Sequence, residues 1–165
     1  GAECIVTVGS EEKAAFCIQA GAAHAINYRT QDFAEEVKRI TGGAGVDVVL
    51  DMVGAPYLQR NLASLRRDGR LVYIAFLEGS KGEADLLPIM VKRLTVTGST
   101  MRPRTLAEKA AIRDALAARV WPALAAGSVR PHIHARFPLA QAAEAHRLME
   151  SGKLIGKIVL EVKPQ

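Results

Sequence analysis

Two kinds of hydrophobic pattern alternate along the chain, and together they predict its secondary structure. Short runs rich in Val, Ile and Leu predict strands, whereas apolar residues that recur every three or four positions predict helices. The predicted strands span residues 3–8, 24–27, 46–51, 70–76, 94–98, 131–137 and 157–162. The predicted helices span residues 11–20, 55–65, 86–93 and 139–151, with one more that Thr30 caps and a long one that begins at Thr105.

The alternation of short strands with helices predicts an α/β fold. Parallel strands need crossover connections, and helical crossovers cover both faces of the sheet, so we expect a Rossmann-type doubly wound parallel sheet. Strand 46–51 is almost continuously apolar and is expected to be buried on both faces. In the long helix that begins at Thr105, Pro122 is expected to produce a bend.

One motif that such a sheet often carries is missing from the sequence. Dinucleotide-binding sheets place a G-x-G-x-x-G turn after their first strand, and no such motif occurs in the 165 residues. We therefore expect the chain to be part of a longer protein, with the first strand and the glycine-rich turn upstream of Gly1.

Composition and charge narrow the possible partners. The net charge is +5, but the Lys and Arg residues are scattered and only 5% of the residues are aromatic. Nucleic-acid binding is therefore not expected, because it favours a basic surface interleaved with stacking aromatics. No apolar run reaches the roughly 20 residues that cross a bilayer. Cys4 and Cys17 have neither metal-site nor redox spacing, and we expect them reduced and buried, as in a cytoplasmic protein.

The junction between the first strand and the first helix has the clearest chemical signal. In a dinucleotide-binding sheet, the end of the second strand faces the adenosine ribose, and an acidic residue there binds the ribose hydroxyls. Here the strand ends in Gly9-Ser10, with Lys13 one helical turn later. A small residue leaves room for a 2′-phosphate, which a hydroxyl and an ammonium can bind. Alternatively, Ser10 is only an N-cap and Lys13 a surface lysine; Glu11 and Glu12 argue against a phosphate unless they point to solvent.

Other polar residues give weaker functional signals. Asp51 ends a strand at the edge where open α/β sheets bind ligands, but it can equally cap the following helix, which we favour. His132 and His134 lie two apart on a predicted strand and lack further zinc ligands, so we interpret them as surface residues. Because no Ser-His-Asp or paired-carboxylate arrangement is evident, no catalytic residue is assigned, which is consistent with hydride transfer by a cofactor.

Several segments, in their order along the chain, resemble one enzyme family. They are Val8-Gly9-Ser10 with Lys13, Gly21-Ala22 leading to Ile26-Asn27-Tyr28-Arg29, Thr41-Gly42-Gly43 before Val46-Asp47-Val48-Val49, Asp51-Met52-Val53-Gly54, Gly69-Arg70-Leu71-Val72, and Ala145-His146 through Gly152 to Gly156-Lys157-Ile158-Val159-Leu160. Together they are similar to the quinone oxidoreductase (zeta-crystallin-like) branch of the medium-chain dehydrogenase/reductase superfamily, in its C-terminal cofactor-binding portion.

The resemblance implies an NADPH-dependent, zinc-independent oxidoreductase that transfers a hydride to quinones or related conjugated carbonyls. It also implies where NADPH would lie. Gly9, Ser10 and Lys13 would surround the 2′-phosphate, and Tyr28 would pack near the adenosine. The residues expected near the ribose and nicotinamide are Met52, Val53, Ile74, Ala75, Phe76, Thr100, Met101, Arg102 and Lys157. Glu78 departs from the family pattern and is expected to point away from the cofactor.

The family's organisation implies two parts and a partner. Residues 1–102 would form the truncated dinucleotide-binding domain, and residues 103–165 would return toward an absent catalytic domain, so that the chain alone would be inactive. Relatives commonly form homodimers through the strand that corresponds to residues 94–100, whose Val96-Thr97-Gly98-Ser99 segment carries no charge that would discourage edge pairing. Two alternatives stay open: an enoyl-thioester reductase, and a non-enzymatic dinucleotide-binding or oligomerising module.

Overall fold

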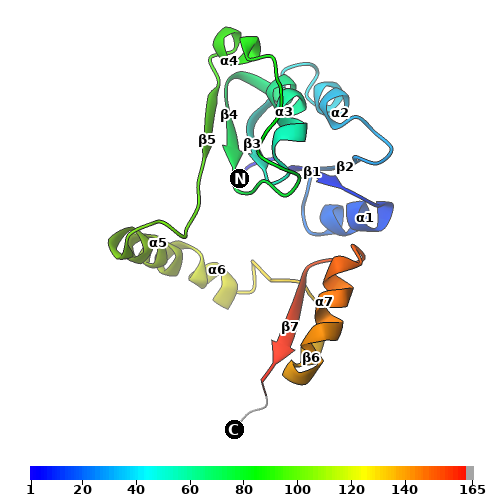
Figure 1. The fold of residues 1–165 in the computed structure, drawn as a ribbon, viewed down its shortest axis with the longest axis vertical. Helices are drawn as coiled ribbons and strands as arrows, with labels where there is room; N and C mark the ends of the chain where they lie inside the picture. Colours follow the sequence, from blue (N-terminus) through cyan, green and yellow to red (C-terminus); the bar gives the residue numbers. More distant parts are fainter. Residues whose placement is uncertain (163–165) are drawn as a thin grey trace. The chain divides into compact units, whose positions relative to one another are not determined.

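The computed structural model describes residues 1–162, which divide into two compact units. One unit comprises Gly1–Pro103 and the other begins at Arg104 (Figure 1). The first unit contains β1 to β5 with α1 to α4, and the second contains α5 to α7 with β6 and β7. All strand pairs in both units are parallel, as the sequence pattern predicts.

The first unit begins with a strand-helix-strand segment. It consists of β1 (Ile5–Val8), α1 (Glu11–Gln19) and β2 (His24–Asn27), followed by α2 (Phe33–Ile40). In the β1–β2 pair, Ile5 lies opposite His24 and Val8 opposite Asn27. A small core of Ile26, Phe33 and Val37 fixes α2 on this sheet.

A second sheet follows in the same unit. Its elements are β3 (Val46–Asp51), the 3-10 helix η1 (Ala55–Tyr57), α3 (Leu58–Ser64), β4 (Leu65–Tyr73), α4 (Leu87–Val91) and β5 (Thr95–Gly98). The strand order is β3-β4-β5. Leu62, Leu65 and Leu71 are fully buried in its core. Because Val46 of β3 also packs against the Ile26 cluster, the two sheets share one hydrophobic interior.

The fourth strand differs from its prediction. β4 begins at Leu65 and not at Arg70, and the preceding helix ends at Ser64. Asp68 has a φ of 62°, and the β3–β4 register shifts between Val46 and Val48. The Asp68-Gly69 pair therefore makes an irregularity inside the strand, where a turn before the strand was expected.

The N-cap of α2 was also predicted wrongly. Asp32 caps this helix, because its carboxylate accepts bonds from the backbone nitrogens of Ala34 (2.8 Å) and Glu35 (3.2 Å). The Thr30 hydroxyl donates instead to the carbonyl of Asn27. Both residue types favour N-caps, so the identity of the residue alone did not decide between them.

The sheet of the first unit is in two pieces. Among the described residues, β1 and β2 pair only with each other. β3 pairs only with β4, which also pairs with β5. On β3, Val48 is 43% exposed and Leu50 is 61% exposed. The expectation that this strand is buried on both faces is therefore wrong for the described residues, since both side chains stay substantially exposed.

The second unit has two helices followed by a small sheet. Its elements are α5 (Leu106–Arg119), α6 (Trp121–Ala125), β6 (Ile133–Pro138), the 3-10 helix η2 (Leu139–Gln141), α7 (Ala142–Glu150) and β7 (Lys157–Glu161). The predicted long helix breaks at Val120, because Pro122 lies in the first turn of α6. Thr105 caps α5, and Glu108 bonds back to it in a capping box.

The structure tests two expectations from the composition, the lack of a membrane-spanning segment and the burial of the two cysteines. In the part of the chain that the structure describes, no helix is long and apolar enough to cross a membrane. Cys4 and Cys17 are free thiols, but Cys4 is exposed and Cys17 only half-buried, so the expected burial of both is wrong. Cys4 precedes β1, outside the paired part of the strand.

Lys92 anchors the carboxyl end of α3. Its ammonium donates to three carbonyls, those of Leu62 (3.0 Å), Ala63 (2.9 Å) and Leu65 (2.7 Å). These oxygens lie at the end of the helix, where backbone carbonyls lack partners within the helix. Partial burial lowers the pKa of Lys92.

We predict that Lys92→Met lowers the free energy of unfolding by about 1–3 kcal/mol, since it leaves these carbonyls without their donor. Urea unfolding followed by circular dichroism measures the effect. Lys81→Met, in an exposed loop, is the control and should leave the midpoint unchanged. Equal midpoints for both variants would refute the role of the Lys92 ammonium.

Candidate functional site

The ends of β1 and β2 bring one group of predicted site residues together. Gly9 and Ser10 follow β1, and Tyr28 follows β2, with the Tyr28 nitrogen donating to the Val8 carbonyl over 3.0 Å. A Cβ added to Gly9 would lie 2.7 Å from the Tyr28 hydroxyl and 3.4 Å from Nε of Arg29. The absence of a side chain at Gly9 is what lets the Tyr28 ring lie against this backbone. Arg29, which was not among the predicted site residues, adds a positive charge here.

Ser10 and Lys13 occupy the first turn of α1. The Ser10 hydroxyl accepts a hydrogen bond from the backbone nitrogen of Lys13 over 3.3 Å. Ser10 is therefore an N-cap, as the simpler interpretation holds. An N-cap also places the hydroxyl beside the positive end of the helix dipole, where anions bind favourably. Glu11 accepts a 2.7 Å bond from the side-chain amide of Asn27, which ties this carboxylate to β2.

The ends of β3 and β4 bring a second group together. The backbone nitrogen of Leu77 donates to the Met52 carbonyl over 3.0 Å, and that of Glu78 to the Val53 carbonyl over 2.9 Å. Met52 and Val53 therefore lie beside the residues that follow β4, which are Ile74, Ala75 and Phe76. These three were predicted inside the strand, but β4 ends at Tyr73. Met52, Ile74 and Phe76 are about half exposed, so their side chains can contact a ligand.

A buried polar cluster lies beneath this second group. Asp51 is 4% exposed and Asn61 2% exposed. One Asp51 oxygen accepts from the Gly54 nitrogen (2.7 Å) and the other from the Asn61 side-chain amide (3.0 Å). Burial raises the pKa of Tyr73 and the Asp51 carboxylate raises it further, whereas a bond to Asn61 opposes these effects. The interpretation of Asp51 as the cap of the following helix is wrong, because neither η1 nor α3 has a side-chain cap; its carboxylate instead holds the turn that precedes η1 through Gly54.

Tyr57 connects the two groups electrostatically. The Arg60 guanidinium lies over the Tyr57 ring at 4.4 Å and over the Phe33 ring at 4.8 Å. Burial raises the pKa of Tyr57, Arg60 opposes this, and Glu78 and Tyr28 raise the pKa further. Tyr57 thus lies within electrostatic range of Tyr28 from the first group and Glu78 from the second. The sequence pattern offers no signal for this contact beyond an aromatic residue and a cation three positions apart, Tyr57 at the end of η1 and Arg60 on α3.

For the remaining predicted site residues, the structure gives fewer contacts with the two strand-end groups. Thr100, Met101 and Arg102 follow β5, and the backbone nitrogen of Ser99 donates to the Tyr73 carbonyl, so this segment starts beside the end of β4. Lys157 begins β7 in the second unit, where its nitrogen bonds the His132 carbonyl. Its expected contact with the cofactor stays a prediction.

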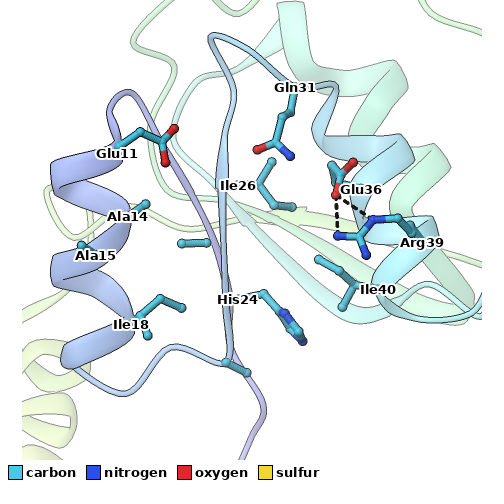
Figure 2. A pocket seen from close by; sticks show the side chains of 12 residues that line it. Glu11, Ala14, Ala15, Ile18, His24, Ile26, Gln31, Glu36, Arg39 and Ile40 are labelled. Atoms are coloured by element: carbon cyan, nitrogen blue, oxygen red, sulfur yellow. Dashed lines mark hydrogen bonds and ion pairs between the residues drawn. The ribbon is translucent and has the colours of Figure 1, made fainter.

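A separate open depression lies at the outer edge of β2 (Figure 2). Its volume is about 530 Å³, and it is lined from α1, β2 and α2. Ile18, Ile26 and Ile40 form its apolar part, while Glu36 and Arg39 form an ion pair at 2.7 Å on its rim. Its lining contains none of the predicted cofactor residues, so we do not place the cofactor there.

Metal ligands do not gather in the described part of the chain. Within residues 1–162, no three His, Cys, Asp or Glu side chains lie close enough to hold a metal ion. His132 precedes β6 and His134 lies on it, and both are exposed, as expected of surface histidines.

Comparison with known proteins identifies a family model and several relatives that this chain resembles. Residues 20–160 match the family model described as zinc-binding dehydrogenase. The chain is 40% identical to a 2-haloacrylate reductase from Burkholderia sp, covering 97% of this chain and 48% of the relative. It is 28% identical to the human quinone oxidoreductase, covering 97% of this chain and 47% of that protein.

A solved structure extends the similarity to the fold. The Escherichia coli quinone oxidoreductase in complex with NADPH superimposes with a TM-score of 0.79 at 31% identity, over 96% of this chain and 50% of that one. The chain thus spans about half the length of the relatives that it matches. The family match, the parallel strands with their helices and the relatives lead to one conclusion: this chain belongs to the zinc-binding dehydrogenase family, in the cofactor-binding portion of the medium-chain dehydrogenase/reductase superfamily.

Proposed function

We propose that the intact protein is an NADPH-dependent oxidoreductase that transfers a hydride to quinones or related conjugated carbonyls, and that this chain supplies most of its cofactor-binding half. The observation that carries the proposal is the position of the two residue groups at the carboxyl ends of parallel strands. Open α/β sheets bind their ligands at this edge.

The divided sheet supports a dinucleotide fold. In a Rossmann sheet the first strand is central, with the second and third on one side and the fourth to sixth on the other. The observed orders β1-β2 and β3-β4-β5 match those two sides. We infer that a parallel strand carrying the glycine-rich turn fits between β1 and β3, where it would pair with the open edge of β3.

The adenosine end of NADPH would lie at Gly9, Ser10, Lys13 and Tyr28. Gly9 lets the Tyr28 ring lie close to the end of β1, since a Cβ there would press on the Tyr28 hydroxyl. The N-terminus of α1 and the Ser10 hydroxyl favour an anion. The Lys13 ammonium would neutralise the 2′-phosphate by a charge-assisted bond.

The nicotinamide end would lie along Met52, Val53 and the segment from Ile74 to Phe76. The carbonyls of Met52 and Val53 bond the residues just after this segment, and Met52, Ile74 and Phe76 are about half exposed. Thr100, Met101, Arg102 and Lys157 are proposed to complete it. The bound cofactor supplies the hydride, while these residues orient the ring and exclude water. We assign no acid or base within this chain.

We place no zinc-dependent step on this chain. The family name mentions zinc, but the described residues offer no set of three ligands for it. The proposal of a zinc-independent reaction rests on the resemblance to quinone oxidoreductases. We also propose a cytoplasmic location, which suits the two free thiols.

The direct test is oxidation of NADPH and NADH by the intact gene product, including any sequence adjoining this chain. Acceptors should be a quinone, a 2-haloacrylate and a 2-enoyl thioester. We expect NADPH turnover with the quinone, with the haloacrylate as the second acceptor that the 40% identical relative suggests. Turnover with the thioester alone would make the protein an enoyl reductase. Turnover with none of the three would favour a non-enzymatic dinucleotide-binding module.

Lys13→Ala tests the phosphate site. If Lys13 binds the 2′-phosphate, the variant should raise the KM for NADPH at least about tenfold (about 1.4 kcal/mol) while sparing NADH. Lys38→Ala on α2 removes an exposed lysine on a different helix and serves as the control. An equal change in both KM values would contradict the assignment of Lys13.

We further propose a homodimer that pairs through residues 94–100. Every residue of β5 is exposed, and β5 is an edge strand of its sheet. An unprotected edge presents unpaired backbone groups to a second copy. Light scattering at tens of micromolar should give twice the chain mass, and Val96→Pro should give the monomer because proline removes a backbone donor that faces the open edge of β5. A monomeric parent protein would refute this interface.

A further inference from the structure

The strand-end turn after β3 depends on two buried polar side chains that are not among the proposed cofactor contacts. Asp51 and Asn61 are both nearly inaccessible to solvent. The Asp51 carboxylate bonds the Gly54 nitrogen at 2.7 Å on one side and the Asn61 amide at 3.0 Å on the other. It therefore joins the turn at residues 51–54 to helix α3.

The turn has little freedom on its other side. Gly54 has a φ of 109°, and a Cβ there would lie 2.3 Å from the Gly79 carbonyl oxygen. The same carbonyl accepts a 2.9 Å bond from Ala55. Only glycine fits this close approach, so the turn is held between the Asp51 carboxylate and the loop that follows β4.

Met52 and Val53 lie inside this turn. Their carbonyls bond Leu77 and Glu78, which belong to a loop. The Asp51–Asn61 bond is a side-chain connection from the turn to α3, which contributes the fully buried Leu62 to the core. The position of Met52 and Val53 relative to the rest of the strand ends therefore depends on this bond.

We propose that Asp51 and Asn61 are positioning residues for the nicotinamide dinucleotide: their buried hydrogen bond fixes the turn that presents Met52 and Val53 to the cofactor. This inference rests on the proposed function. It also separates two effects. The bond acts on the part of the site that NADPH and NADH share, whereas Lys13 acts on the 2′-phosphate that only NADPH carries.

The chemistry of the pair provides matched variants. Asn61→Leu keeps the side-chain size but leaves a buried carboxylate oxygen without its donor, which is costly. The exchange Asp51→Asn with Asn61→Asp restores both contacts, because an amide at position 51 can accept from Gly54 and donate to a carboxylate at position 61. Ser64→Ala is the control. It removes a buried hydroxyl from the same helix that donates to the Arg60 carbonyl and not to the turn.

The experiment measures dissociation constants of NADPH and NADH for the intact gene product by titration calorimetry. Asn61→Leu should raise the dissociation constants of both NADPH and NADH by about tenfold and leave the ratio of the two constants unchanged. The exchange variant should return both constants to within about threefold of the parent, and Ser64→Ala should leave them unchanged. Amide hydrogen exchange at Gly54, Leu77 and Glu78 should accelerate in Asn61→Leu and recover in the exchange variant.

Several results would overturn the inference. One is an Asn61→Leu protein that melts earlier but binds both cofactors as the parent does, because the bond would then serve stability alone. If Asn61→Leu does not fold, a folded exchange variant with weak binding of both cofactors contradicts the proposal, and parent-like binding supports it. A parent protein that binds neither cofactor would instead refute the proposed function itself, which distinguishes the two failures.

Discussion

Parallel pairing of short strands is the constraint on which the rest of this structure depends. Each parallel connection must return the chain to the starting edge through a helix, so the carboxyl ends of β1 and β2, and those of β3 and β4, gather side by side. Residues far apart in the sequence, such as Gly9 and Tyr28, or Val53 and Glu78, become neighbours for this reason. The candidate site is a consequence of topology, and its chemistry comes from the residues at the strand ends.

Much of this could be predicted from the sequence because it depends on local patterns. The apolar runs located the strands, and the Gly9-Ser10 junction identified the first strand end correctly. What failed depended on specific three-dimensional competition. Asp32 took the cap position predicted for Thr30, and Asp68 adopted a left-handed conformation within β4. Such choices between similar residues are decided by packing and hydrogen-bond geometry that a pattern does not contain.

The buried Asp51–Asn61 pair shows the same limit for the site. Asp51 was noticed because it ends a strand, but its partner lies ten positions later on α3 and has no distinguishing motif. Tyr57 and Arg60 were missed for the same reason. The exposed Val48 and Leu50 make the complementary point: their hydrophobicity predicts burial on both faces of β3, but the described residues leave much of both side chains exposed.

The central claim is that both strand-end groups bind one NADPH molecule. The most direct measurement is a backbone NMR titration of the intact protein, first with NADPH and then with NADH. The account predicts that NADPH shifts the amides of Gly9 and Ser10 together with those of Met52 and Val53, and that NADH reproduces the shifts of the second pair more fully than those of the first. Shifts confined to the depression at the outer edge of β2, or no shifts at either strand-end group, would contradict it.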